Sequence, residues 1–352
     1  MKTKILVILI ILVGLGVGGF FVYKNITAPK IEKGVVPAPS TEVSVYKGTW
    51  TPALLSKNSI KLASDMRKLK DLGMNTVFFQ AGPPQIEYCL RGIPSDSRLA
   101  KKVKDIIPIQ DELLISNIQI AHKNGLKVAL TMAKCSGGMG LEDWVDLEAW
   151  NSRVVELAKL AEKHEVELFA PMNEPEVLFG PSASATWGQE ILPRIKEVYH
   201  GKIIWKGGAP GDIEPDPGNP NLTNFSGYDY RGVTLGIGSG PGTLEMFSRN
   251  IDNELDTMLS LAERDNCEGV MISEFYGRLP GDWEEREWNE EKEARAHEIV
   301  LEKGSKYDEV VGFFALDFLE LSYLGEDLPG LPGPEESSKT EDVIRRWFRE
   351  IL

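Results

Sequence analysis

Short apolar runs that alternate with amphipathic helical patterns constrain the fold of this 352-residue chain more than any other feature. Eight runs have the length and composition of buried strands, at residues 43–50, 75–82, 126–135, 166–176, 202–208, 227–236, 268–277 and 309–318. Helical patterns follow nearly all of them, at residues 62–73, 111–125, 147–164, 187–201, 243–266, 285–304 and 340–352. This alternation predicts an α/β fold whose parallel strands close into a (β/α)8 TIM barrel.

An open, doubly wound sheet is the alternative architecture. Such a sheet seldom continues through eight units without a glycine-rich loop that binds phosphate. Residues 14–19 match the letters G-x-G-x-x-G, but they lie in an apolar run with no strand and helix around them. The match therefore does not indicate a dinucleotide site.

The first 42 residues differ in character from the rest of the chain. Residues 5–23 form an apolar run between lysines, long enough to span a bilayer of ~30 Å. A cleaved signal peptide is the alternative, although the run ends in bulky residues that make a poor cleavage site. We expect a transmembrane anchor at 1–24, a proline-containing linker at 25–42 and a catalytic domain at 43–352, placed outside the cell.

Composition excludes several classes of function. The formal net charge is −14 and no basic stripe occurs, so nucleic acid is not expected as a partner. The four histidines show no metal-ligand spacing, and no motif for a phosphate loop or a serine nucleophile occurs, so we expect no metal and no cofactor. The sequence does not decide whether any disulfide forms among Cys89, Cys135 and Cys267. The low glutamine content hints at a thermophilic source.

Two glutamates close two of the predicted strands. Glu174 ends the fourth strand in "FAPMNEPE", and Glu274 ends the seventh in "MISEFYG". In a (β/α)8 barrel the carboxyl ends of all strands meet at one mouth, so both side chains are expected there. Glycoside hydrolysis requires a carboxylic acid and a carboxylate on opposite sides of the sugar. Alternatively, residues 173–175 form a helix-capping turn, and Glu274 forms a structural salt bridge.

Asn173-Glu174-Pro175 after a fourth strand, with Glu274 after a seventh, resembles the clan of retaining β-glycoside hydrolases with an eightfold barrel, which includes cellulases, β-mannanases and β-galactosidases. The resemblance implies that Glu174 is the general acid/base and Glu274 the nucleophile. It also implies that Asn173 binds the 2-hydroxyl of the sugar. Members often carry a tryptophan at the eighth strand end, where this chain has Asp317 nearby, and a tyrosine or histidine at the sixth, where it has Gly236.

Further residues at strand ends and in the following segments are candidates for sugar contacts. Aromatic rings stack on the apolar faces of sugars, and polar side chains bind their hydroxyls. Tyr276 could take the place of the missing sixth-strand side chain. The remaining candidates for substrate binding are Trp50, Gln80, Trp187, Trp283 and Asp317. Packing in the core could also explain the three tryptophans.

We therefore expect a glycoside hydrolase that cleaves β-linked glucan or mannan with retention, through two glutamates. Endo action is favoured because the aromatic candidates are spread over several loops. An exo-acting β-glycosidase would use the same carboxylates. A carbohydrate-binding surface protein on the same barrel would bind sugar without turnover, and a barrel lyase or isomerase would need a site such as Lys134 at the third strand end.

Overall fold

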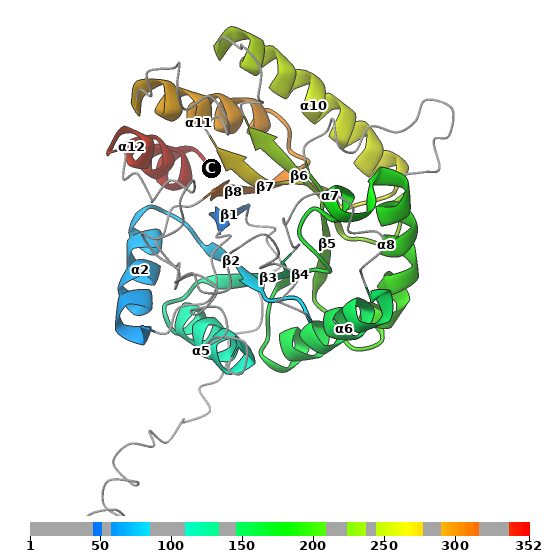
Figure 1. The fold of residues 1–352 in the computed structure, drawn as a ribbon. Coiled ribbons are helices and arrows are strands. Elements are labelled where there is room, and N and C mark those ends of the chain that lie inside the picture. Colours follow the sequence, from blue (N-terminus) through cyan, green and yellow to red (C-terminus); the bar gives the residue numbers. More distant parts are fainter. Residues whose placement is uncertain are drawn as a thin grey trace, which may run out of the picture. The chain divides into compact units, whose positions relative to one another are not determined.

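The predicted strands form one closed barrel in the computed structural model of the protein (Figure 1). The structure describes residues 45–50, 58–84, 110–133, 146–208, 224–236, 244–276, 290–316 and 338–352. The eight strands within these residues are β1 (Tyr46–Trp50), β2 (Thr76–Ala81), β3 (Lys127–Met132), β4 (Leu168–Ala170), β5 (Lys202–Lys206), β6 (Tyr230–Gly236), β7 (Gly269–Tyr276) and β8 (Val310–Leu316). Each strand pairs in parallel with the next, and β8 pairs with β1. The prediction of a (β/α)8 barrel is confirmed.

Helices surround this ring of strands in Figure 1. Those in the described residues are α2 (Ser59–Asp71), α5 (Gln110–Lys123), α6 (Leu147–Lys163), α7 (Pro175–Phe179), α8 (Pro181–Lys196), α10 (Leu244–Arg264), α11 (Glu290–Gly304) and α12 (Ser338–Arg346), followed by a π-helical turn, η3 (Trp347–Ile351). Gly73 and Gly125 follow α2 and α5 with φ of 88° and 72°, values that glycine adopts without strain. These glycines end the two helices where the sequence predicts.

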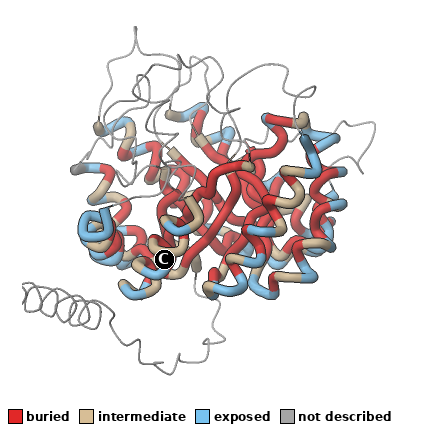
Figure 2. Tube along the Cα trace, turned by 60° about the horizontal axis from the view of Figure 1, so that its bottom comes forward, coloured by how far each residue is buried: buried red, intermediate tan, exposed pale blue. Residues whose placement is uncertain are grey.

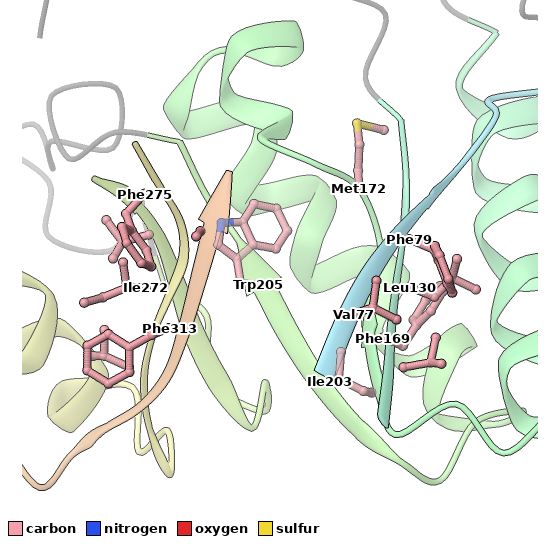
Figure 3. Close-up of a cluster of buried hydrophobic side chains, with 14 of the residues drawn as sticks. Val77, Phe79, Leu130, Phe169, Met172, Ile203, Trp205, Ile272, Phe275 and Phe313 are labelled. Carbon is pink, nitrogen blue, oxygen red and sulfur yellow. The ribbon is translucent and has the colours of Figure 1, made fainter. Parts of the chain in front are cut away.

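The helices pack on the barrel through one apolar stripe each. In α10 the buried residues are Phe247, Ile251, Leu255, Met258 and Ala262, and their three- and four-residue spacing places them on one face. Figure 2 shows the result: the strands are buried, whereas the helices alternate between buried and exposed residues. The strand side chains that belong to the core between strands and helices form groups in Figure 3. Ile272, Phe275 and Phe313 lie in one group, and Phe79, Leu130 and Phe169 lie in another.

A second apolar cluster fills the inside of the barrel. It contains one or two side chains from each strand, since every second residue of a strand faces inward. Phe78 and Phe314 meet edge to face at 5.5 Å between ring centroids. The full cluster is Trp50, Phe78, Ala129, Leu168, Ala170, Ile204, Tyr230, Met271, Val311 and Phe314. The interior is thus packed, and only the last inward-facing positions are free to be polar.

One ion pair is buried between the barrel and its helices. Arg231 on β6 and Asp265, just after α10, meet at 2.8 Å, and their side chains are 0% and 1% exposed. Asp265 also accepts a hydrogen bond from the backbone N–H of Phe225, whose ring lies 4.7 Å from the guanidinium carbon. Burial lowers the pKa of Arg231 to about 10, against the opposing effect of Asp265. The pair joins β6, α10 and the segment before β6.

The predicted anchor at 1–24 and linker at 25–42 lie outside the described residues. Among the residues that the structure does describe, no helix is both long and apolar enough to cross a bilayer. Residues Ser44–Leu352 form one compact unit. Cys267 is a free thiol, half-buried, and Cys89 and Cys135 lie in undescribed segments.

Removing one partner of the buried ion pair should be costly. We expect Asp265→Ala to lower the free energy of unfolding by about 3–5 kcal/mol, because it removes the acidic partner of the buried Arg231 charge. The double variant Arg231→Met/Asp265→Leu should lose less, since it buries no charge. Denaturant unfolding of the three proteins measures both values. A double variant at least as unstable as Asp265→Ala would contradict the interpretation.

Candidate active site

The carboxyl ends of the strands place polar side chains at the top of the apolar interior. Those on β2, β3 and β5 each lie two residues after an inward-facing apolar side chain, and those on β6 and β7 are paired with each other. All are buried, with exposed fractions of 9% or less. The residues are Gln80 on β2, Thr131 on β3, Lys206 on β5, Thr234 on β6 and Glu274 on β7, together with Trp50 on β1.

Glu174 reaches this mouth through an unusual backbone conformation. It occupies the N-cap position of α7, with Pro175 at the start of the helix, and has φ of 45° and ψ of 59°. This left-handed region costs a non-glycine residue roughly 1–2 kcal/mol. Its side chain makes no capping hydrogen bond. The backbone N–H donates instead to the carbonyl of Lys206 at 2.9 Å, and Oε1 accepts from the hydroxyl of Thr234 at 2.8 Å.

The capping alternative considered for residues 173–175 is therefore half right. Pro175 does begin a helix, and Glu174 does stand at its cap position. The glutamate side chain, however, points to Thr234 on the neighbouring part of the barrel rather than back to the helix. A strained backbone is held here by bonds to β5 and β6, and its effect is to bring a carboxyl group to the mouth.

Glu274 faces the mouth because of an irregularity in β7. Val233 is paired with Ile272, but the next residue, Thr234, is paired with Glu274, so Ser273 is an extra residue in β7. Met271 faces the interior, and strict alternation would turn residue 273 inward and residue 274 outward. The bulge reverses this for Glu274, while Phe275 packs in the outer core.

Lys206 is the ionic partner of Glu274. Its ammonium lies 3.1 Å from Oε2 of Glu274 and 4.4 Å from the centroid of the Trp50 ring. The Lys206 side chain is 0% exposed and that of Glu274 is 9% exposed. A charge removed from water in this way is stable only when it is paired, and the attraction between the two groups is strong at low dielectric.

Two residues connect the two glutamates. Thr234 donates its hydroxyl to Glu174 and is the pairing partner of Glu274 on the adjacent strand, at a strand spacing of about 4.8 Å. Lys206 binds Glu274 through its ammonium and Glu174 through its carbonyl. Glu174 and Glu274, which are 100 residues apart in sequence, therefore lie at the same place in the fold.

The structure brings other predicted site residues close to this pair. Asn173 is 2% exposed, and its backbone N–H donates to Met132. Its Oδ1 and the indole nitrogen of Trp50 are buried polar atoms without a hydrogen-bond partner in the described structure. Such atoms are costly unless a ligand or water satisfies them. Gln80 lies at the end of β2, 6% exposed.

Tyr276 occupies the space that the missing sixth-strand side chain would take. Gly236 and Tyr276 are pairing partners at the ends of β6 and β7. A Cβ atom on Gly236 would lie 2.2 Å from Cζ of the Tyr276 ring, so only glycine allows the ring to lie there. Gly236 and the position of the Tyr276 ring are thus linked, since the absent side chain of the glycine makes room for the ring.

The remaining predicted residues do not join the site in the described structure. Trp187 on α8 is 4% exposed and packs in the outer core against Phe179 and Trp205, and its indole N–H donates to Asn151. This packing accounts for Trp187 fully, and we do not retain it among the substrate-binding candidates. Trp283, Asp317 and Lys134 lie outside the described residues.

Three functional candidates were not recognised from the sequence: Lys206, Thr234 and Glu176. The signal for Lys206 was present in "KIIWKGG", where a lysine takes an inward position at the end of an apolar strand. Glu176 is 5% exposed, and its Oε1 accepts from the indole N–H of Trp205 at 2.8 Å. Burial raises the pKa of Glu176 to about 7, against its hydrogen bonds and with a further contribution from the charge of Glu174.

Histidine, cysteine, aspartate and glutamate side chains are the usual protein ligands of metal ions. In the described ranges, no group of three or more histidine, cysteine, aspartate or glutamate side chains could hold an ion. His297, the most buried histidine described, binds the carbonyl of Glu293 through Nδ1 and contacts the Phe275 ring. The chemistry available at the mouth is that of two carboxyl groups beside a buried cation.

Comparison with known proteins identifies the fold but no family. No family model matches the sequence, and no curated protein matches it. A GH113 β-1,4-mannanase is similar in structure, with a TM-score of 0.60 and 16% identity over 87% of this chain and 99% of that one. The endo-β-1,4-mannanase from Thermotoga petrophila gives 0.57 and 12%, over 88% and 77%. A β-glucuronidase from an uncultured Clostridium sp. gives 0.56 and 15%, over 88% and 51%. This chain thus has the barrel fold found in these glycoside hydrolases.

The raised pKa of Glu176 predicts a pH-dependent stability. Because its folded pKa of about 7 exceeds the ordinary 4.5, the folded state binds this proton more tightly. The stabilisation is complete below pH ~4.5 and falls by about 3 kcal/mol as the pH rises to ~7. Glu176→Gln mimics the protonated form and should lose this decline.

Chemical denaturation of wild type and Glu176→Gln at pH 4.5 and 7.5 tests this expectation. The variant should gain stability relative to wild type at the higher pH. Burial lowers the pKa of His297 to about 4 and so gives an opposite trend, but that contribution is common to both proteins and cancels in the difference. An equal difference at the two pH values would show that Glu176 does not titrate in this range.

Proposed function

We propose that the protein is a retaining β-glycoside hydrolase in which Glu174 is the general acid/base and Glu274 the nucleophile. The observation that carries the proposal is the meeting of these two glutamates at the ends of the fourth and seventh strands, through Thr234 and Lys206. A structural explanation of either glutamate alone does not account for both being aimed at one mouth. The pair supplies the acid and the anion that glycosidic bond cleavage requires.

Different surroundings support different roles for the two carboxyl groups. Glu274 contacts the ammonium of Lys206, which favours the ionised carboxylate needed for attack. Glu174 receives a neutral hydroxyl and lies near Glu176, whose negative charge at higher pH favours retention of a proton. Two carboxyl groups with divergent environments are the usual basis for dividing the roles of acid and nucleophile.

The proposed reaction has two steps. Glu174 gives its proton to the glycosidic oxygen while a carboxylate oxygen of Glu274 attacks the anomeric carbon, so that the carbon–oxygen bond breaks and the leaving sugar departs as an alcohol. Glu174, now an anion, takes a proton from water, which attacks the anomeric carbon and breaks the ester bond to Glu274. The product keeps the β configuration, and both glutamates return to their starting states.

Unsatisfied polar atoms beside the glutamates support contacts with sugar hydroxyls. We propose that Asn173 binds the 2-hydroxyl and that the indole N–H of Trp50 binds a second hydroxyl, since each has a buried polar atom without a partner in the described structure. Gln80 and Tyr276 stand at the ends of β2 and β7 and extend the same surface. A bound sugar would satisfy groups that are otherwise costly to bury.

A β-linked mannan is the substrate class we place first, ahead of a glucan, with endo action. The support is the similarity in fold to mannanases, which includes nearly the whole length of a GH113 β-1,4-mannanase. An exo-acting β-glycosidase is the second candidate, favoured by the similar fold of a β-glucuronidase, of which this chain spans about half. Release of oligosaccharides of mixed length from a polymer would distinguish endo action from the single-sugar product of exo action.

Loss of either glutamate should abolish turnover without unfolding the protein. We expect Glu174→Gln to lower kcat on unactivated substrates by roughly 10²–10⁴-fold, and Glu274→Gln to reduce it to background. Glu190→Gln, on the exposed face of α8, makes the same chemical change away from the mouth and should be fully active. Melting temperatures of Glu174→Gln and Glu190→Gln should stay near that of wild type, whereas that of Glu274→Gln should fall, because the Lys206 ammonium then stays buried without its anion. Unimpaired hydrolysis by Glu174→Gln or Glu274→Gln would contradict the assignment of the two glutamates.

Azide separates the two roles. With an activated aryl glycoside, Glu274→Gly plus azide should give an α-glycosyl azide, because azide then attacks in place of the nucleophile. Glu174→Ala plus azide should give the β-glycosyl azide, because azide then replaces water in the second step. A non-catalytic sugar-binding protein would bind ligand but give neither product.

Attachment to a membrane, with the barrel outside the cell, is a further proposal that rests on the apolar run at residues 5–23 and the proline-containing segment after it. We expect the full-length chain to remain in the membrane fraction after an alkaline wash, and a chain beginning near residue 43 to be released. Mass measurement of the purified chain would reveal cleavage, which is the outcome expected for a signal peptide instead.

A further inference from the structure

Lys206 is a buried cation that the proposed mechanism does not yet use. It comes from β5 and faces the barrel interior, two residues after the inward-facing Ile204. Its side chain is 0% exposed, its ammonium lies 3.1 Å from Glu274, and its carbonyl accepts the backbone N–H of Glu174 at 2.9 Å. An apolar residue would fill this position at much lower cost in desolvation, so the charge calls for a functional explanation.

Lys206 also takes the place of the sixth-strand tyrosine or histidine that is often found in the clan of glycoside hydrolases that this chain resembles. That position is Gly236 here, covered by the Tyr276 ring. The Glu274 carboxylate instead accepts a hydrogen bond from the Lys206 ammonium on β5, which carries a full positive charge. A tyrosine hydroxyl offers the carboxylate one neutral hydrogen bond, whereas an ammonium also stabilises negative charge over distance.

We propose, on the basis of the proposed function, that Lys206 is a positioning residue that accelerates the release of the sugar from Glu274. In the first step the Glu274 carboxylate becomes a neutral ester, and the negative charge appears on Glu174, which has given up its proton. The total charge is unchanged, but the Lys206 ammonium has lost the anion beside it. The covalent intermediate therefore contains a buried cation whose closest partner is neutral.

The second step restores the pair. Water attacks the anomeric carbon, Glu174 takes the proton, and the electron pair of the breaking ester bond returns to the Glu274 carboxylate next to the ammonium. Negative charge thus develops in the transition state at the atom that Lys206 already contacts, without any rearrangement of the protein. Lys206 makes Glu274 a better leaving group, and its main effect falls on the hydrolysis of the intermediate.

The test compares wild type with Lys206→Met, which keeps the length of the side chain and removes its charge. The substrate is the dinitrophenyl β-glycoside that wild type hydrolyses best in a panel, because its activated leaving group makes the first step fast. We expect Lys206→Met to lower kcat roughly 100-fold, the scale of removing one preorganised electrostatic contact. KM should fall in parallel, kcat/KM should change far less, and a burst of dinitrophenol near one per active site should precede the steady state.

Two further variants separate charge from packing. Lys206→Gln keeps an N–H donor without the charge and should show the same burst, and it decides the question if Lys206→Met does not fold. Lys206→Arg keeps the charge and should recover much of the steady-state rate without a burst. Mass spectrometry of the quenched Lys206→Met reaction should find the sugar on the peptide that contains Glu274.

The outcomes distinguish the two levels of the proposal. An active wild type with folded, neutral Lys206 variants that show no burst, and that lose kcat and kcat/KM equally, would overturn the role of Lys206 alone. A Lys206→Arg variant as impaired as Lys206→Gln would do the same, because charge would then not matter. A wild type without hydrolysis of any β-glycoside in the panel would overturn the proposed function, and this inference with it.

Discussion

Closure of the parallel sheet into a ring is the constraint from which the other features follow. Once every strand is paired on both sides, alternate side chains must face a narrow interior, and apolar groups such as Phe78, Phe314 and Met271 fill it. The last inward positions cannot be covered by a further layer, so they are the places where polar groups are tolerated. Lys206, Thr234 and Glu274 stand at these positions. The site is the unfilled top layer of the core.

The fold and the two glutamates could be predicted from the sequence because they depend on local patterns. Alternating strand and helix signals gave the barrel, and strand ends gave Glu174 and Glu274. The bonds between them could not be predicted, since they depend on which strand faces which. Lys206 looked like the end of an apolar run, and Trp187 was a candidate for sugar contact although it lies on α8 and packs against Trp205. The hydrophobic periodicity of the sequence reveals neither one-residue register shifts nor buried ion pairs.

The buried ionisable groups near the mouth differ in whether their surroundings favour the charged or the neutral form. Glu176 favours its neutral form, with a pKa raised to about 7 by burial, and Glu274 is held beside a cation. Outside the barrel, Arg231 is balanced by Asp265. Each of these buried groups has a partner or is held in its neutral form, as the low dielectric requires. Catalysis by transfer of charge from Glu274 to Glu174 would keep the interior at constant total charge throughout.

The extra residue in β7 means that the direction of the Glu274 side chain depends on the bulge, not only on which residues the strand contains. If the strand straightened and Ser273 took a regular place in the pairing, Ser273 would face the mouth and Glu274 would face the surrounding helices. A barrel with every site side chain still encoded would then have no Glu274 carboxylate in its mouth. Loss of Ser273 would have no such effect, because Glu274 would follow Ile272 directly and would still face inward.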